Sequence, residues 1–384
     1  MDLDLAPEQQ DFVKTIQGFV DDVIRPNAER WDEEHELPMD AVKQMGELGL
    51  FGLPFPEEYG GSGSDFLTLC LAIEEIARVD SSLAITLEAA VGLGAMPIYR
   101  FGSEEQRQRW LPPLATGESL AGFGLTEPGG GSDAGAARTT ARLQDGEWVI
   151  NGSKSFITNS GTPITSFVTV TALTNEPGQP RETSAIIVPQ GTPGFEVGKP
   201  YRKMGWWHSD THELSFNDCR VPEENLLGER GQGFKNFMMI LEDGRIAIAA
   251  LAVGLAQGCL DECLKYVHER TAFGKPIGSF QALQFKMADM ATKIELARHA
   301  YYRAAWAKEQ GRPYRKEAAM AKLFASEMAV DVARDAVQIH GGYGYIEEFP
   351  VCRHFRDSKI LEIGEGTSEV MRILIARELG LPSA

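Results

Sequence analysis

Cysteine and positive charge are both scarce in this sequence of 384 residues. The five cysteines form no CxxC pair, and Cys259 and Cys263 have no His or further Cys at ligand spacing nearby. We therefore expect reduced, buried thiols, with no disulfide and no metal site. The 37 Lys and Arg residues are outnumbered by 55 Asp and Glu residues, and the net charge is −18. This charge repels nucleic-acid phosphates and anionic lipid heads, so we expect neither as a partner.

Long apolar runs and targeting segments are missing as well. The richest apolar stretch, Leu83 to Tyr99, contains Glu88 and Pro97, which predicts a buried helix and not a membrane span. The segment Met1 to Pro7 lacks the basic and apolar regions of a signal peptide and the Arg-rich character of a transit peptide. We expect an unprocessed cytoplasmic protein with no membrane insertion.

Three regions with different residue patterns follow one another along the chain. From Pro7 to about Phe101 the apolar residues recur at helical spacing, apart from a polar loop at Pro54 to Ser64. After about Ser119 come short alternating segments with turn residues between them, which predict a small antiparallel sheet domain. Helical spacing returns from about Gly233. The clearest strand segments are Trp148 to Ile150, Phe167 to Leu173, Thr183 to Val188 and Glu213 to Phe216.

A glycine run stands at the entry to the sheet region, within the segment from Gly124 to Asp133. Three consecutive glycines let the backbone approach a ligand and turn its N–H groups toward a polar ring edge or a phosphate. Taken alone, such a run is more often a flexible surface turn. No GxGxxG follows a strand here, so this is not a dinucleotide fingerprint.

Glu365 lies between Gly364 and Gly366, just before a helical run that Thr367 or Ser368 caps. Acidic residues at this place commonly only complement the helix dipole. The flanking glycines clear space around one carboxylate, which is how a site brings a substrate carbon to a base. This pattern favours Glu365 as a candidate catalytic residue.

Other segments leave alternatives open. Phe156 and Thr158 are two positions apart on a predicted strand and therefore on one face, where an aromatic residue usually belongs to the core. The segments at 242–245, 270–275 and 338–345 could be solvated helix ends, or the last could cradle a phosphate. The aromatic segment 204–208, with Trp206 and Trp207, could line the substrate path, pack between domains or contact a redox partner.

Taken together and in order, these segments resemble the acyl-CoA dehydrogenase family over essentially the whole chain. The motifs that carry the resemblance are TEPGGGSD at 126–133, FITN at 156–159, DCRVP at 218–222, RTAFGKPI at 270–277, QIHGGYGY at 338–345 and EGTSE at 365–369. No single motif would suffice, but their assembly in this order by chance is not credible.

The resemblance implies an α+β multidomain fold, which matches the order of helical, sheet and helical regions in the sequence. An N-terminal α-helical domain would cover 1–119, a middle β-barrel domain 120–228 and a C-terminal four-helix bundle 229–384. The resemblance also implies FAD as cofactor, an acyl-CoA substrate, an electron-transferring flavoprotein as partner and a homotetramer in which FAD is shared between subunits.

Site residues are carried over by position. Around the flavin ring the family pattern implies Phe123, Leu125, Thr126, Gly131, Ser132, Phe156, Ile157 and Thr158. For the pyrophosphate and adenine of an FAD seated mainly in a neighbouring subunit it implies Arg270, Phe273, Gln281, Gln338, Ile339, Gly341 and Gly342, with Thr367 and Glu369 completing that site. For the substrate it implies Ser132, Glu242, Arg245 and Gly366.

In similar enzymes a carboxylate removes the α-proton of the acyl thioester while the β-hydrogen leaves as hydride to the flavin, which gives the trans-2-enoyl-CoA. Glu365 occupies the matching position, and burial should raise its pKa. Some members place the base where Gly244 stands here, and glycine cannot serve. Many relatives have Tyr where this chain has Gly364, and Trp where it has Phe156.

Two other functions stay open at this point. An acyl-CoA oxidase performs the same first half-reaction, but such proteins usually carry a long C-terminal extension. A catalytically inactive acyl-CoA-binding relative would have lost the base or the glycine turn, and both are present. The sequence does not indicate the length, branching or ring content of the acyl chain.

Overall fold

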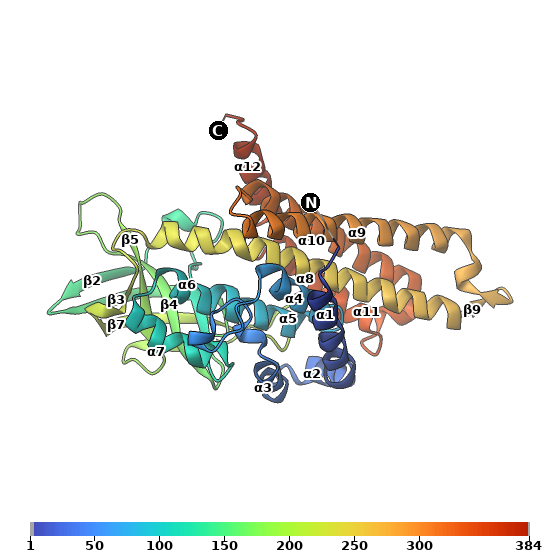
Figure 1. The fold of residues 1–384 in the computed structure, drawn as a ribbon, viewed down its shortest axis with the longest axis horizontal. Helices are drawn as coiled ribbons and strands as arrows, with labels where there is room; N and C mark the ends of the chain where they lie inside the picture. Colours follow the sequence, from blue (N-terminus) through green and yellow to red (C-terminus); the bar gives the residue numbers. More distant parts are fainter. Residues whose placement is uncertain (1–3, 383–384) are drawn as a thin grey trace.

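A computed structural model describes residues 4–382, and helices dominate both ends of the chain. Figure 1 shows the sheet at one end of the long axis, the first helices below the centre, and α8, α9 and α10 running side by side along the rest. The N-terminal helices are α1 (Pro7–Phe19), α2 (Ala28–Glu34), α3 (Met39–Glu47), α4 (Phe66–Ala77), α5 (Ser81–Glu88), α6 (Met96–Phe101) and α7 (Glu104–Ala115). Two π-helical segments, η1 (Val20–Ile24) and η4 (Ala89–Ala95), continue α1 and α5.

The middle region is an eight-stranded sheet with the order β6-β7-β3-β2-β4-β5-β8. Most neighbours are antiparallel, as expected, but β1 pairs with β4 in parallel and β2 meets β4 in a parallel bridge, so the sheet is mixed. Within the described residues this path does not close on itself. The strands are β1 (Leu120–Gly124), β2 (Thr140–Gln144), β3 (Glu147–Thr158), β4 (Thr165–Leu173), β5 (Thr183–Pro189), β6 (Phe195–Pro200), β7 (Thr211–Pro222) and β8 (Leu226–Leu227).

Three long helices build the C-terminal bundle, and two shorter ones pack on it. The long ones are α8 (Gly233–Glu269), α9 (Gln281–Glu309) and α10 (Arg315–His340), and the short ones are α11 (Pro350–Ser358) and α12 (Ser368–Glu378). A small hairpin of β9 (Thr271–Ala272) and β10 (Lys275–Pro276) joins α8 to α9. The expected helical, sheet and helical regions are confirmed.

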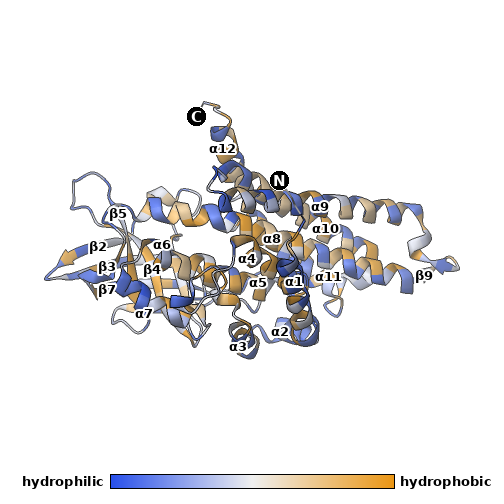
Figure 2. Cartoon of the chain, viewed as in Figure 1, coloured by the Kyte–Doolittle hydropathy of each residue, from blue (hydrophilic) through white to orange (hydrophobic). Residues whose placement is uncertain are grey.

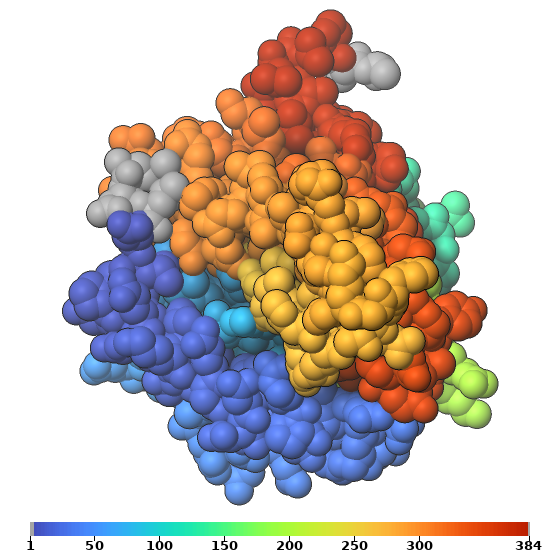
Figure 3. Space-filling view, turned by 90° about the vertical axis from the view of Figure 1, so that its right-hand side faces the viewer, coloured from blue at the N-terminus to red at the C-terminus, as the bar shows by residue number. Residues whose placement is uncertain are grey.

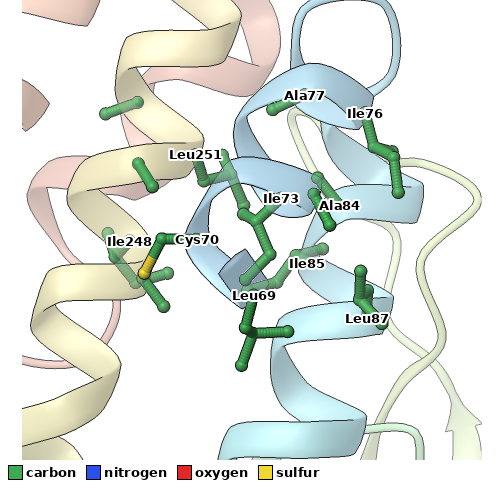
Figure 4. Packing of buried hydrophobic residues seen from close by; sticks show 14 of the residues in the cluster. Leu69, Cys70, Ile73, Ile76, Ala77, Ala84, Ile85, Leu87, Ile248 and Leu251 are labelled. Carbon is green, nitrogen blue, oxygen red and sulfur yellow. The ribbon is translucent and has the colours of Figure 1, made fainter. Parts of the chain in front are cut away.

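The helical core lies where α4 and α5 meet α8. Figure 4 shows Leu69, Cys70 and Ile73 facing Ile248 and Leu251 across this interface. In Figure 2 the hydrophobic colour gathers along these central helices and in the sheet. Burial removes the apolar surface of these side chains from water, worth about 25 cal/mol per Å².

Two glycines let α8 approach α4 closely. A Cβ at Gly254 would lie 2.9 Å from the Cβ of Ala77 and still nearer to the Glu74 carbonyl oxygen. A Cβ at Gly258 would lie 2.9 Å from the carbonyl carbon of Arg78 and nearer still to its oxygen. Only glycine therefore fits at these two positions of α8, where the helix contacts α4.

The helical run Ser81–Phe101 is long and apolar enough to cross a membrane, but 89% of its most apolar window is buried inside the protein. It contains α5, η4 and α6, which pack against β1, α7 and α8. The prediction of a buried helix in this stretch is confirmed. Cys70, Cys219, Cys259 and Cys263 are free and buried as expected, whereas Cys352 is half-buried.

The aromatic segment at 204–208 packs between domains. The backbone N–H of Trp206 donates to Asp357 of α11 over 2.6 Å, and its indole Nε1–H donates to Ser81 of α5 over 3.1 Å. His208 pairs with buried Asp80 at 2.9 Å. The segment therefore ties the sheet domain to α5 and α11, which resolves the alternatives that its sequence left open for Trp206. Trp207 stacks on His35, with ring centroids 4.3 Å apart.

Candidate active site

Glu365 lies in a short connection between a 3₁₀ turn (Lys359–Glu362) and α12. Its backbone is left-handed, with φ 52°, a conformation that non-glycine residues adopt rarely and that costs of order 1–3 kcal/mol. Gly366 follows with φ 104°. Thr367 caps α12, because its side chain accepts from the backbone N–H of Val370 at 3.2 Å. The connection therefore fixes the direction in which the Glu365 side chain points.

The Glu365 carboxylate is directed into the protein, against α8. The residue as a whole is half-buried, but both carboxylate oxygens are shielded from solvent, and no donor among residues 4–382 pairs with either one. A Cβ at Gly244 would lie 3.0 Å from the Glu365 carboxyl carbon and overlap Oε2. Gly244 therefore provides the space that this carboxylate occupies.

Two buried cations face Glu365. Lys322 of α10 is fully buried and donates from Nζ to the Gly366 carbonyl oxygen at 2.6 Å. Burial lowers the pKa of Lys322 to about 8, while the charge of Glu365 opposes that shift. Arg245 of α8 is also buried, and its Nε and Nη1 have no hydrogen-bond partner in the described part of the chain. Burial lowers the pKa of Arg245, against the attraction of Glu242 and Glu365.

A second carboxylate, Glu88, lies beside Glu365. It is 0% exposed at the end of α5. Burial, and then the charge of Glu365, raise the pKa of Glu88 well above its usual range. Burial also raises the pKa of Glu365, whereas the neighbouring Glu88 carboxyl group and the charges of Lys322 and Arg245 oppose that rise. The expected direction for the Glu365 pKa is therefore found in the structure.

The glycine turn is held by a buried ion pair. Glu127 accepts from Lys154 Nζ at 2.8 Å and from the Thr139 backbone N–H at 3.0 Å. Glu127 and Gly130 exchange backbone hydrogen bonds of 3.0 and 3.3 Å, which close the turn. A Cβ at Gly129 would meet nothing within 4 Å, and at Gly130 and Gly131 it would make only ordinary contacts of 3.5 and 3.6 Å, so packing does not require these glycines. This open cradle fits a ligand edge at the end of β1.

Phe156 lies beside this turn on β3, and the sequence expectation for it needs a correction. The register of β3 shifts between Lys154 and Ile157, and Phe156 has φ 62°. This β-bulge interrupts the regular alternation on which the shared face of Phe156 and Thr158 was predicted. Phe156 is 65% exposed, so it is not a core residue. Its ring is available to cover a planar group.

The remaining candidates near the sheet divide by burial. Ser132 and Gly131 are exposed, and Thr126 and Thr158 are half-buried. Phe123, Leu125 and Ile157 are buried, and Phe123 stacks on Phe237 of α8 with ring centroids 3.9 Å apart. The buried side chains hold β1 and β3 in place, so only their backbone could meet a cofactor.

A second group of candidates lies at the far end of the bundle. Figure 3 looks onto this end of the molecule, where the connection between α8 and α9, which contains the β9–β10 hairpin, faces the viewer. A pocket of about 480 Å³ there is lined by Arg270, Ile339, Gly341 and Gly342 among others. Neither glycine has an atom within 4 Å of its Cβ position, so the pocket combines glycine backbone, open space and the Arg270 cation, which suit a phosphate group.

The other members of this group surround the pocket. Phe273 is 94% exposed at the β9–β10 hairpin, with φ 53°. Gln281 is exposed at the first turn of α9, and Gln338 is exposed near the end of α10. Within the described residues, the Phe273 ring makes an edge contact with Phe280 at a centroid distance of 6.0 Å, and most of its surface is left open.

The two groups do not meet within one copy. Arg245, next to Glu365, and Arg270, at the tip, are both on α8 or its C-cap. They are 25 residues apart, and a rise of 1.5 Å per residue places them roughly 38 Å apart. Thr367 and Glu369, at the start of α12, lie with Glu365 and not with the tip.

The substrate candidates also differ in placement. Glu242 is half-buried and pairs with Arg315 at 3.0 Å, whereas Arg245 is buried toward Glu365. Gly366 presents its carbonyl to Lys322. Sequence reasoning missed two members of the site, Glu88 and Lys322. Their signal was a charged residue within an apolar or alanine-rich helical stretch.

Comparison with known proteins gives one consistent result. Family models for the acyl-CoA dehydrogenase N-terminal, middle and C-terminal domains match residues 6–118, 122–219 and 231–380. The chain is 52% identical to "Probable acyl-CoA dehydrogenase YngJ" of Bacillus subtilis, covering 99% of this chain and 100% of that protein.

Solved structures agree. The chain matches the butyryl-CoA dehydrogenase structure from Megasphaera elsdenii at 44% identity and a TM-score of 0.95, covering 99% and 100% of the two chains. It matches a chain in the structure described as the electron transferring flavoprotein of Acidaminococcus fermentans at 48% identity and a TM-score of 0.95, covering 99% of both. With a buried carboxylate before α12, the three regions in order and these matches over nearly its full length, the chain belongs to the acyl-CoA dehydrogenase family.

Proposed function

We propose that this protein uses FAD to desaturate a short straight-chain acyl-CoA to the trans-2-enoyl-CoA and passes the electrons to an electron-transferring flavoprotein. Acyl-CoA dehydrogenation follows from the family. The short chain is supported by the likeness to butyryl-CoA dehydrogenase, and the acceptor by the likeness to a chain in the flavoprotein structure. The observation that carries the proposal is the buried Glu365 carboxylate, which has no hydrogen-bond partner in the described residues and is attached to a left-handed backbone.

Glu365 would remove the α-proton of the bound thioester. A carboxylate that is shielded from water is a stronger base than an exposed one. The backbone N–H of Glu365 has no acceptor among residues 4–382, so it is free to donate to the thioester carbonyl as negative charge develops there. The bound FAD supplies the hydride acceptor for the β-hydrogen.

The FAD site fits two copies of the chain. Phe156, Ser132 and the glycine turn suit the ring, and the pocket with Arg270 and Gly342 suits the phosphates. Because Arg245 and Arg270 lie roughly 38 Å apart along α8 of one copy, the second group would serve the FAD of a neighbouring subunit. Exposed apolar side chains on the bundle support self-association: Phe285, Leu296, Met320, Phe324 and Ile373.

On these grounds we propose that the protein is a homotetramer, which a measurement of its mass in solution tests. Light scattering of the flavin-loaded protein should give four times the chain mass of 42.1 kDa. Phe273→Ser removes a ring that is 94% exposed, so it should leave the chain folded while it weakens flavin retention. A protein that is monomeric with its flavin fully bound would contradict this assembly.

The test of the activity is anaerobic bleaching of the bound flavin by butyryl-CoA. Glu365→Gln should keep the yellow colour and slow bleaching by about 10² to 10⁴, the usual contribution of a positioned base. Full bleaching at the wild-type rate in this variant would refute the assignment of the base. A panel of straight, branched and cyclic acyl-CoAs measures the substrate class, and longer or branched substrates bleaching faster would refute the short straight chain.

The electron acceptor needs a separate measurement. In air, a dehydrogenase should release little hydrogen peroxide and should reduce an added electron-transferring flavoprotein. Peroxide formed in step with enoyl-CoA would instead identify an oxidase. A protein that binds butyryl-CoA without any bleaching would be an inactive relative.

A further inference from the structure

Glu88 lies at a point where the helix geometry changes. The α-helix α5 ends at this residue, and the π-helical segment η4 begins at Ala89. A π-turn is wider than an α-turn and occurs often at functional sites. A Cβ at Gly92 would lie 2.9 Å from Glu88 Oε1, so this glycine leaves room for the carboxyl group. The fold therefore accommodates a carboxyl group in an apolar interior.

Neither oxygen of Glu88 meets a hydrogen-bond donor among the described residues, and the same holds for Glu365. The two carboxyl groups nevertheless lie near enough that each affects the pKa of the other. Two ionised carboxylates there would repel each other and leave buried charge uncompensated. One proton between them supplies the missing donor and turns repulsion into a charge-assisted hydrogen bond.

The surrounding charges decide which group keeps the proton. Lys322 of α10 and Arg245 of α8 both act on Glu365 and favour its anion. Glu88 has no cation among its neighbours in the described chain, only Glu365 and the buried Cys70 thiol of α4.

We propose that Glu88 is a positioning residue, which holds a proton and donates it as an O–H hydrogen bond to the Glu365 carboxylate, so that the base stays ionised and directed at the substrate. The inference rests on the proposed function, because it assigns Glu365 as the base. No covalent step is involved: the proton remains on Glu88 while Glu365 accepts the α-proton.

The first test is the pH dependence of flavin reduction by butyryl-CoA in the flavin-loaded enzyme. Glu88→Leu removes the donor and keeps the site dry, so the acid limb of kcat/KM should move up by roughly one pKa unit or more. Glu88→Gln retains an N–H donor of nearly the same shape, so its acid limb should stay at the wild-type position. Equal shifts in both variants, or no shift in either, would overturn the proposal, since a merely structural role predicts one of those results.

The second test locates the proton without turnover. The infrared spectrum should contain the C=O band of a protonated carboxyl that shifts in deuterium oxide. Measured well above the acid limb of each protein, this band should persist in Glu365→Gln and disappear in Glu88→Gln. A band that is unchanged by Glu88→Gln, or that disappears only in Glu365→Gln, would overturn the proposal. Retained flavin colour shows that each variant is folded.

The two hypotheses fail in different ways. If Glu365→Gln bleaches at the wild-type rate, Glu365 is not the base and the proposed function needs revision. If that variant is inactive but Glu88→Leu has the wild-type pH profile, the proposed function stands and the role of Glu88 is rejected.

Discussion

Gly244→Ala tests the packing of the base directly. The added methyl would lie 3.0 Å from the Glu365 carboxyl carbon and overlap Oε2. Ordinary carbon contacts are about 3.5–4.0 Å, so the carboxyl carbon must move by about 0.5–1 Å and Oε2 by more. A misplacement near 1 Å can cost about 10² in rate, which corresponds to about 2.7 kcal/mol of barrier at about 1.36 kcal/mol per factor of ten.

The assay is the anaerobic rate of flavin bleaching by butyryl-CoA, with flavin content and Tm measured in parallel. Because the clash involves the end of a flexible side chain, Tm should change little while the rate falls. Gly364→Ala is the matched control next to the base, since its Cβ would make only an ordinary contact of 3.5 Å with the Ile360 carbonyl oxygen. A wild-type rate in Gly244→Ala, or an equal loss in Gly364→Ala, would refute the reasoning.

Two further predictions concern stability. Gly254→Ala forces a methyl against α4, 2.9 Å from the Ala77 Cβ, so the free energy of unfolding measured in urea should fall by about 1–3 kcal/mol. The control is Gly18→Ala, whose added methyl meets nothing within 4 Å and should not destabilise the protein. Equal losses in both variants would contradict the packing argument. Burial and then Arg353 lower the pKa of His354 to about 3, so the unfolded chain binds a proton that the folded chain does not, and stability present above pH 6.5 is lost as the pH falls toward 3. His354→Gln should flatten this fall in urea midpoints between pH 7 and pH 5, and an unchanged slope would show that His354 does not cause it.

The sequence predicted the order of the helical, sheet and helical regions, and it marked Glu365 as the candidate base, because both inferences depend on local signals. Helical spacing, strand alternation and the glycines around Glu365 are all visible in short windows. Leu283, Met287, Met290 and Ile294 recur at helical spacing; the last three are buried and Leu283 is half-buried.

Long-range features could not be predicted in this way. The parallel pairing of β1 with β4 depends on contacts 45 residues apart, between Leu120 and Thr165. The meeting of Glu88 with Glu365 requires α5 and the turn before α12 to reach the same place. The bulge at Phe156 arises from a register shift against β7, which no single strand segment reveals.

The length of α8 has a consequence for how the protein is handled. The ring site and the phosphate pocket lie at opposite ends of this helix and would serve one FAD only when two copies meet. The fraction of protein that holds FAD would then depend on the protein concentration, through the assembly equilibrium. FAD would then dissociate from the protein on dilution, even though every chain stays folded. Concentrated stocks would stay yellow, and activity lost on dilution would return on adding FAD together with more protein.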